Sequence, residues 1–121
     1  MEVVAVIGAS SDESRYSYQA MKLLAEHGHQ AIPVHPRETE VMGKKVVNNL
    51  ADLVGQKVDT VTVYVNPAIS NKYKNDLLNL MPKRVIFNPG AENPELGLAL
   101  SSKGILVENA CTLVLLRTGQ Y

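Results

Sequence analysis

Residues Val3–Ile7 form a short, continuously apolar and mostly β-branched run that ends at Gly8. Such a run is typical of a strand buried on both faces of a parallel sheet. A polar loop follows, and helical apolar spacing then predicts a helix whose apolar face begins at Tyr16 and which ends near Gly28. A buried strand that feeds a helix through a loop favours a right-handed parallel α/β fold.

The alternation of strands and helices continues along the rest of the chain. Two Asn-Pro pairs supply an N-cap and a first helical residue, and each of them opens an expected helix. Further strands are expected at residues 31–34, 60–65, 84–87 and 105–107, helices at 66–80, 93–103 and 111–116, and a short extended piece and helix at 45–47 and 50–54. The predicted fold is a doubly wound, parallel, five-stranded sheet of Rossmann type in a single domain, residues 1–121.

Charge and cysteine content exclude several classes of partner. Twelve Lys and Arg balance twelve Asp and Glu, so no global positive field favours nucleic acid or an anionic membrane. Cys111 is the only cysteine, which excludes an internal disulfide and a Cys-rich zinc site and suggests a reducing cytoplasm. The N-terminal sequence lacks a signal-peptide pattern. We expect a soluble cytoplasmic protein without a metal site.

In a doubly wound sheet, ligands bind beyond the carboxyl ends of the strands, near the point where the strand order reverses. This rule selects four segments, which we expect to converge on one crevice: residues 8–11, 35–37, 65–67 and 88–91.

The loop after the first strand has the geometry that directs free backbone N–H groups at a phosphate. Its small residues, Gly8 to Ser11, allow a diphosphate to approach the backbone, and Ser17 can add a hydroxyl donor. An ordinary strand-to-helix turn, with serines capping the helix, explains the same residues equally well.

His35-Pro36-Arg37 follows the second strand, where an NAD site usually places an acidic residue. A cation at this position suits a ribose that carries a phosphate, either in NADP or in coenzyme A (CoA). The alternative is a solvated surface arginine, and an inward-pointing Glu38 would weaken the phosphate interpretation.

The two remaining strand ends carry weaker signals. Asn88-Pro89-Gly90 offers an amide and a flexible turn, although a plain Pro-Gly turn explains it as well. Val65 and Pro67 flank a helix start and provide an apolar edge for an adenine.

Together these segments resemble the small CoA-binding proteins related to the N-terminal domain of the succinyl-CoA synthetase α-subunit. The likeness extends over nearly the whole chain and is carried by Val6–Ser10, Arg15–Tyr18, Gly28–Arg37, Gly43–Val47, Val58–Val61 and Val85–Glu92. The family pattern has Asn-Pro-Lys and Gln-Pro-Gly where this chain has His35-Pro36-Arg37 and Asn88-Pro89-Gly90. The phosphorylated histidine of the ligase belongs to another domain and has no counterpart here. The resemblance implies CoA or an acyl-CoA as the ligand, without autonomous acyl-CoA ligation.

The sequence therefore leads to one preferred function and two alternatives. We expect CoA binding without a catalytic residue, so an enzyme is the less favoured interpretation. The alternatives are an NADP-binding oxidoreductase and a nucleotide-sensing subunit that acts through a protein partner or a homo-oligomer. The residues expected to contact the ligand are Gly8, Ala9, Ser10, Ser11, Arg15, Ser17, His35, Pro36, Arg37, Val65, Pro67, Asn88, Pro89 and Gly90.

Overall fold

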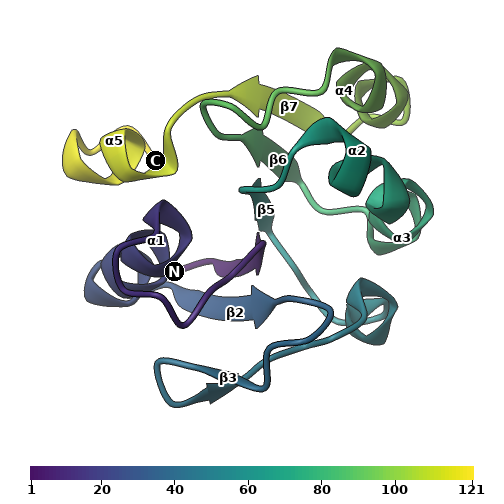
Figure 1. Cartoon of the computed structure of the whole chain (residues 1–121). Coiled ribbons are helices and arrows are strands. Elements are labelled where there is room, and N and C mark those ends of the chain that lie inside the picture. Colours follow the sequence, from purple (N-terminus) through teal and green to yellow (C-terminus); the bar gives the residue numbers. More distant parts are fainter.

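The computed structural model describes every residue from Met1 to Tyr121 and contains the expected alternation of strands and helices (Figure 1). The strands of the main sheet are β1 (Val3–Ile7), β2 (Gln30–Val34), β5 (Thr60–Val63), β6 (Arg84–Phe87) and β7 (Leu106–Asn109). The helices are α1 (Tyr16–Glu26), α2 (Pro67–Ser70), α3 (Lys74–Leu80), α4 (Pro94–Ser101) and α5 (Thr112–Arg117), with 3-10 helices η1 (Leu50–Leu53) and η2 (Asn71–Tyr73). All five strands are parallel, in the order β2-β1-β5-β6-β7.

The sheet is buried on both faces because the side chains of its central strands alternate between two cores. Val4 and Val6 pack in the cluster beneath α1 and α5. Ala5 and Ile7 pack in the larger cluster beneath η1, α3 and α4. In Figure 1 these two groups of helices lie on opposite sides of the sheet. The predicted doubly wound α/β fold is confirmed.

The strand order places the reversal of the winding between β1 and β5. β1 pairs with β2 on one side, with Ile7 opposite Val34, and with β5 on the other, with Ile7 opposite Val63. The chain leaves β1 toward β2 and leaves β5 toward β6, so the connections diverge at the carboxyl ends of these two neighbours. This divergence opens the crevice in which such folds bind ligands.

A short hairpin protects the outer edge of β2. Its strands are β3 (Glu40–Val41) and β4 (Lys44–Lys45), and Val47 forms a parallel bridge to Val34. The Lys44 ammonium also donates to the backbone oxygen of Ala31 at 3.0 Å. The extended piece expected at 45–47 is confirmed in part, since Lys45 lies in β4 and Val47 forms the bridge, but its pairing with β3 was not expected. The 3-10 helix η1 agrees with the short helix expected at 50–54.

The helix expected at residues 66–80 is divided into α2, η2 and α3. Its predicted start is confirmed, since the Asn66 side chain accepts the N–H of Ile69 at 3.1 Å. At the break, the amide of Asn93 donates to Ser70 Oγ and Asn71 Oδ1, both at 2.8 Å. Serine and asparagine are poor helix formers whose side chains find competing hydrogen bonds, which explains the interruption.

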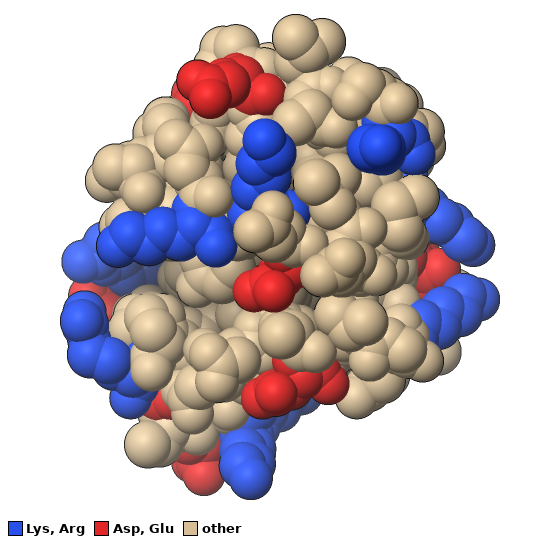
Figure 2. Space-filling view, turned by 90° about the vertical axis from the view of Figure 1, so that its right-hand side faces the viewer, with Lys and Arg blue, Asp and Glu red and all other residues tan.

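Acidic and basic side chains intermingle over the face that carries α2, α3 and α4, where Figure 2 shows no extended area of one charge. This distribution agrees with the formal net charge of +0. No helix is both long and apolar enough to cross a membrane. No three His, Cys, Asp or Glu side chains are grouped so that they could hold a metal ion.

Candidate ligand-binding site

A cavity of about 530 Å³ opens at the carboxyl ends of the strands. Its fourteen lining residues are Gly8, Ala9, Ser10, Arg15, Tyr16, Ser17, His35, Tyr64, Val65, Asn66, Ile69, Pro89, Gly90 and Ala91. They include residues of all four strand-end segments selected from the sequence, together with the start of α1 (residues 15–17), Tyr64 and Ile69. The expected convergence of these segments is therefore confirmed, and nine of the fourteen predicted residues line the cavity.

The glycine that ends β1 brings the loop backbone against the neighbouring strand end. The N–H groups of Gly8 and Ala9 both donate to the backbone oxygen of Val34, at 3.0 and 3.3 Å. Gly8 has a φ of +88°, and a Cβ at this position would lie 2.8 Å from Val65 Cγ1. Both the backbone conformation and the close contact require glycine.

The first turn of α1 faces the cavity with its backbone donors free. Arg15 occupies the N-cap without a capping side-chain hydrogen bond, and the N–H groups of Tyr16, Ser17 and Tyr18 have no acceptor within the protein. The Ser17 hydroxyl is also unpaired, although this residue is only 4% exposed. Free N–H groups at a helix start carry a partial positive charge that attracts anions. The loop serines do not cap the helix: Ser14 instead donates to Asp12 Oδ1 at 2.7 Å.

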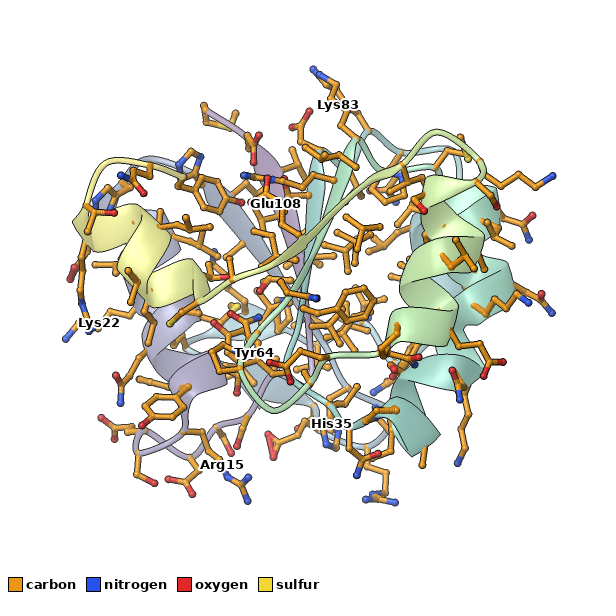
Figure 3. All side chains as sticks on the ribbon, turned by 90° about the horizontal axis from the view of Figure 1, so that it is seen from above. Arg15, Lys22, His35, Tyr64, Lys83 and Glu108 are labelled. Atoms are coloured by element: carbon orange, nitrogen blue, oxygen red, sulfur yellow. The ribbon has the colours of Figure 1, made fainter.

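Arg15 supplies the only Lys or Arg side chain of the cavity, and no Asp or Glu lines it. Its Nε lies 3.8 Å from Asp12 Oδ2, and its side chain is 71% exposed. Hydrogen bonds from Ser14 lower the pKa of Asp12, so this carboxyl stays ionised beside Arg15. Figure 3 shows Arg15, His35 and Tyr64 on the same side of the molecule, opposite Lys83. The charge of Arg15 is thus partly offset by Asp12, which lies outside the cavity lining, so the free N–H groups of α1 and Arg15 together supply the positive character of the cavity.

His35 organises the turn that follows β2. Its Nδ1 accepts the backbone N–H groups of Arg37 and Glu38, each at 3.0 Å. With Nδ1 acting as an acceptor, the neutral ring carries its proton on Nε2 and presents a donor. Pro36 and Arg37 are exposed and lie outside the cavity.

Glu38 does not line the cavity, and its side chain points toward the loop that follows β1. Its carboxylate accepts the N–H of Ser11 at 3.1 Å and the Ser11 hydroxyl at 3.2 Å. Ser11 lies outside the cavity, and its donors are engaged by an acidic side chain. An incoming phosphate would have to compete with this carboxylate for the loop.

The segment after β6 forms a turn in which Ala91 donates its N–H to the backbone oxygen of Asn88 at 2.8 Å. Gly90 has a φ of +89°, as the third residue of a type II turn requires. The Asn88 amide donates to Thr62 Oγ1 at 2.7 Å and accepts the N–H of Thr112 at 2.9 Å. Asn88 thus ties β6 to β5 and α5 and lies outside this cavity, as does Pro67, the first residue of α2.

Five lining residues are absent from the predicted contacts, although the last two belong to the selected segments 65–67 and 88–91: Tyr16, Tyr64, Ile69, Asn66 and Ala91. Tyr16 was expected on the buried face of α1, but it is 71% exposed. The buried face of α1 instead consists of Ser17, Ala20, Met21 and Leu24. Tyr64 directly follows β5, so the rule that selected the strand ends was sufficient to include it.

Comparison with known proteins agrees with this geometry. A family model described as a CoA binding domain matches residues 2–117. The chain belongs to this CoA-binding domain family. The resemblance found in the sequence is thereby confirmed.

Three known proteins are similar to this chain in sequence or in structure. It is 38% identical over 63 residues to the α-subunit of an ADP-forming acetate–CoA ligase II from Pyrococcus furiosus, a match covering 51% of this chain and 14% of that one. It is 34% identical over 61 residues to the uncharacterized protein YneT of Bacillus subtilis, covering 50% and 44%. The chain thus spans less than half the length of these curated relatives. A crystal structure of an uncharacterized protein has a TM-score of 0.94 and 45% identity, covering 100% of this chain and 98% of that one.

Proposed function

We propose that this protein binds CoA or an acyl-CoA in the cavity at the carboxyl ends of the strands, without catalysing a reaction on its own. The observation that carries the proposal is the set of unpaired donors at the start of α1, beside Arg15, in a cavity without a lining carboxylate. The diphosphate of CoA would accept the N–H groups of Tyr16 and Ser17 together with the Ser17 hydroxyl. Residues 1–121 would act as one binding domain.

The remaining parts of the ligand have matching surroundings. The adenine would lie against Val65 and Ile69, which give this wall of the cavity its apolar character. His35 Nε2 would donate to the ribose or its phosphate, and the exposed guanidinium of Arg37 would contact the 3′-phosphate from outside the cavity. This arrangement offers donors and apolar contacts but no general base, because neutral His35 presents N–H and not a free nitrogen.

The location of the protein and its partners are also part of the proposal. Cys111 is a free thiol, so we propose a cytoplasmic location. A relative of this chain is one subunit of a ligase, so action through a protein partner is part of the proposal.

Isothermal titration calorimetry with CoA, NADP⁺, NAD⁺ and ATP at equal ionic strength tests the proposal. CoA is expected to bind most tightly, and Arg15→Gln is expected to weaken CoA binding by about 3- to 10-fold, the effect of losing one exposed phosphate contact. Lys22→Gln is the matched control, because it removes the same charge from an exposed position on α1 outside the cavity. Tighter binding of NADP⁺ than of CoA, or equal effects of the two variants, would reject the assignment.

A further inference from the structure

A second cavity, of about 340 Å³, lies beside the one already described. It is lined by Tyr16, Tyr64, Asn88, Pro89, Cys111, Leu113 and Arg117. Three of these residues, Tyr16, Tyr64 and Pro89, also line the larger cavity. The two cavities therefore share a wall formed by the start of α1 and the ends of β5 and β6.

The walls of the second cavity are suited to an uncharged, apolar group. Leu113 is buried, and the rings of Pro89 and the two tyrosines add further apolar surface. The Asn88 amide is satisfied within the protein and offers nothing to a ligand. Burial raises the pKa of Tyr64 to about 12, so its phenol remains neutral at physiological pH. Arg117 is the only charged residue of the cavity, and it is exposed.

The position of the cavity follows from the strand order. The phosphate-binding elements of the proposed site follow β1 and β2, at one end of the sheet. The second cavity lies at the ends of β5 and β6 and beneath the start of α5, which follows β7. A CoA molecule held by its phosphates beside α1 would extend its sulfur end across the ends of β5 and β6. The second cavity is a partly open, mainly apolar space on that path.

We propose that the second cavity receives the acyl group of a CoA thioester, so that the protein prefers an acyl-CoA with a short apolar chain over free CoA. This inference rests on the proposed function. The cavity has about twice the 150 Å³ of an apolar protein cavity that holds benzene, which leaves room for an acyl chain of about four to six carbons.

Titration calorimetry of the unmodified protein with CoA, acetyl-CoA, butyryl-CoA, hexanoyl-CoA and succinyl-CoA tests the proposal. Each methylene buried adds about 0.8 kcal/mol, or roughly fourfold in affinity, so butyryl-CoA, with two more methylenes, should bind about 15-fold more tightly than acetyl-CoA. Equal affinities for CoA, acetyl-CoA and butyryl-CoA would overturn the acyl site but leave the proposed function intact. Absence of binding by every ligand would reject the proposed function itself.

The succinyl-CoA titration tests the apolar character of the cavity, and a variant at Cys111 tests its space. Tighter binding of succinyl-CoA than of butyryl-CoA would overturn the apolar assignment, because it would mean that Arg117 recognises a carboxylate. Cys111→Leu places a larger side chain in the cavity, and the ratio of butyryl-CoA to CoA affinity should fall to about 1.

Cys111→Ala removes the thiol without filling the cavity. This variant should therefore keep the preference for butyryl-CoA over CoA. Val114→Leu is the matched control, since Val114 is an exposed residue of α5 outside the cavity and gains only one methylene. Circular dichroism establishes that each variant is folded. If Cys111→Leu does not fold, the ligand series on the unmodified protein still decides the question.

Discussion

Replacing Glu38 with glutamine should strengthen CoA binding. The Glu38 carboxylate accepts the N–H and hydroxyl of Ser11 at 3.1 and 3.2 Å, in the loop beside the proposed diphosphate position. Glutamine keeps the shape and one acceptor but removes the negative charge. Two unit charges about 5 Å apart in water repel each other by about 0.8 kcal/mol, and exposed charged contacts contribute at most about 1 kcal/mol. We therefore expect a gain of about 1 kcal/mol, or roughly fivefold in affinity.

Calorimetric titration of Glu38→Gln with CoA at low and high salt measures this gain. The gain should shrink at high salt, because the repulsion between exposed charges is screened. Glu40→Gln changes the net charge equally from an exposed position on β3 and should leave the affinity nearly unchanged. Unchanged or weaker binding by Glu38→Gln at low salt would mean that Glu38 does not oppose the ligand phosphates.

Three other predictions concern single residues. Arg37→Ala should weaken CoA binding about 10-fold without affecting dephospho-CoA, measured by calorimetry; equal losses would remove the 3′-phosphate contact. Gly8→Ala should lower the unfolding free energy by about 1 to 3 kcal/mol in urea titrations, and by more than Gly55→Ala, whose Cβ would meet no atom within 4 Å. Asp59 accepts the N–H of Val3, which lowers its pKa; Asp59→Asn should therefore reduce stability at pH 7 by about 1 kcal/mol, and a loss that does not shrink below about pH 3.8 would contradict this.

The sequence predicted the fold well because its strong signals are local. A β-branched run such as Val3–Ile7 can be buried only between two layers of helices, and the Asn-Pro pairs fix the starts of two helices. The prediction of one continuous helix at 66–80 was wrong, and the β3–β4 hairpin was not predicted, because contacts between residues distant in sequence decide both structures. The break between α2 and α3 involves Asn93, which is distant in sequence from Ser70 and bonds to it. The hairpin β3–β4 depends on the exposed edge of β2, which local spacing does not reveal.

The candidate site was predictable in outline, because the ends of parallel strands must meet at one edge of the sheet. The role of each side chain was less accessible. Asn88 has the amide expected of a ligand contact, but the buried Thr62 and Thr112 take up its hydrogen bonds. Tyr16 has the apolar character of a core residue, yet its position on α1 directs it toward the cavity. For Tyr16, only the rotation of α1 about its axis decides between the core and the cavity.

A titration of ¹⁵N-labelled protein with CoA, followed through its amide NMR signals, tests whether this cavity is a CoA site. We expect the largest shift changes at the amides of Ser10, Tyr16 and Ser17, with smaller ones at Glu38 and Gly90. Amides at the opposite edge of the sheet should remain nearly unchanged. Shift changes concentrated at that opposite edge, or none at CoA concentrations up to the millimolar range, would contradict the claim that this cavity is a CoA site.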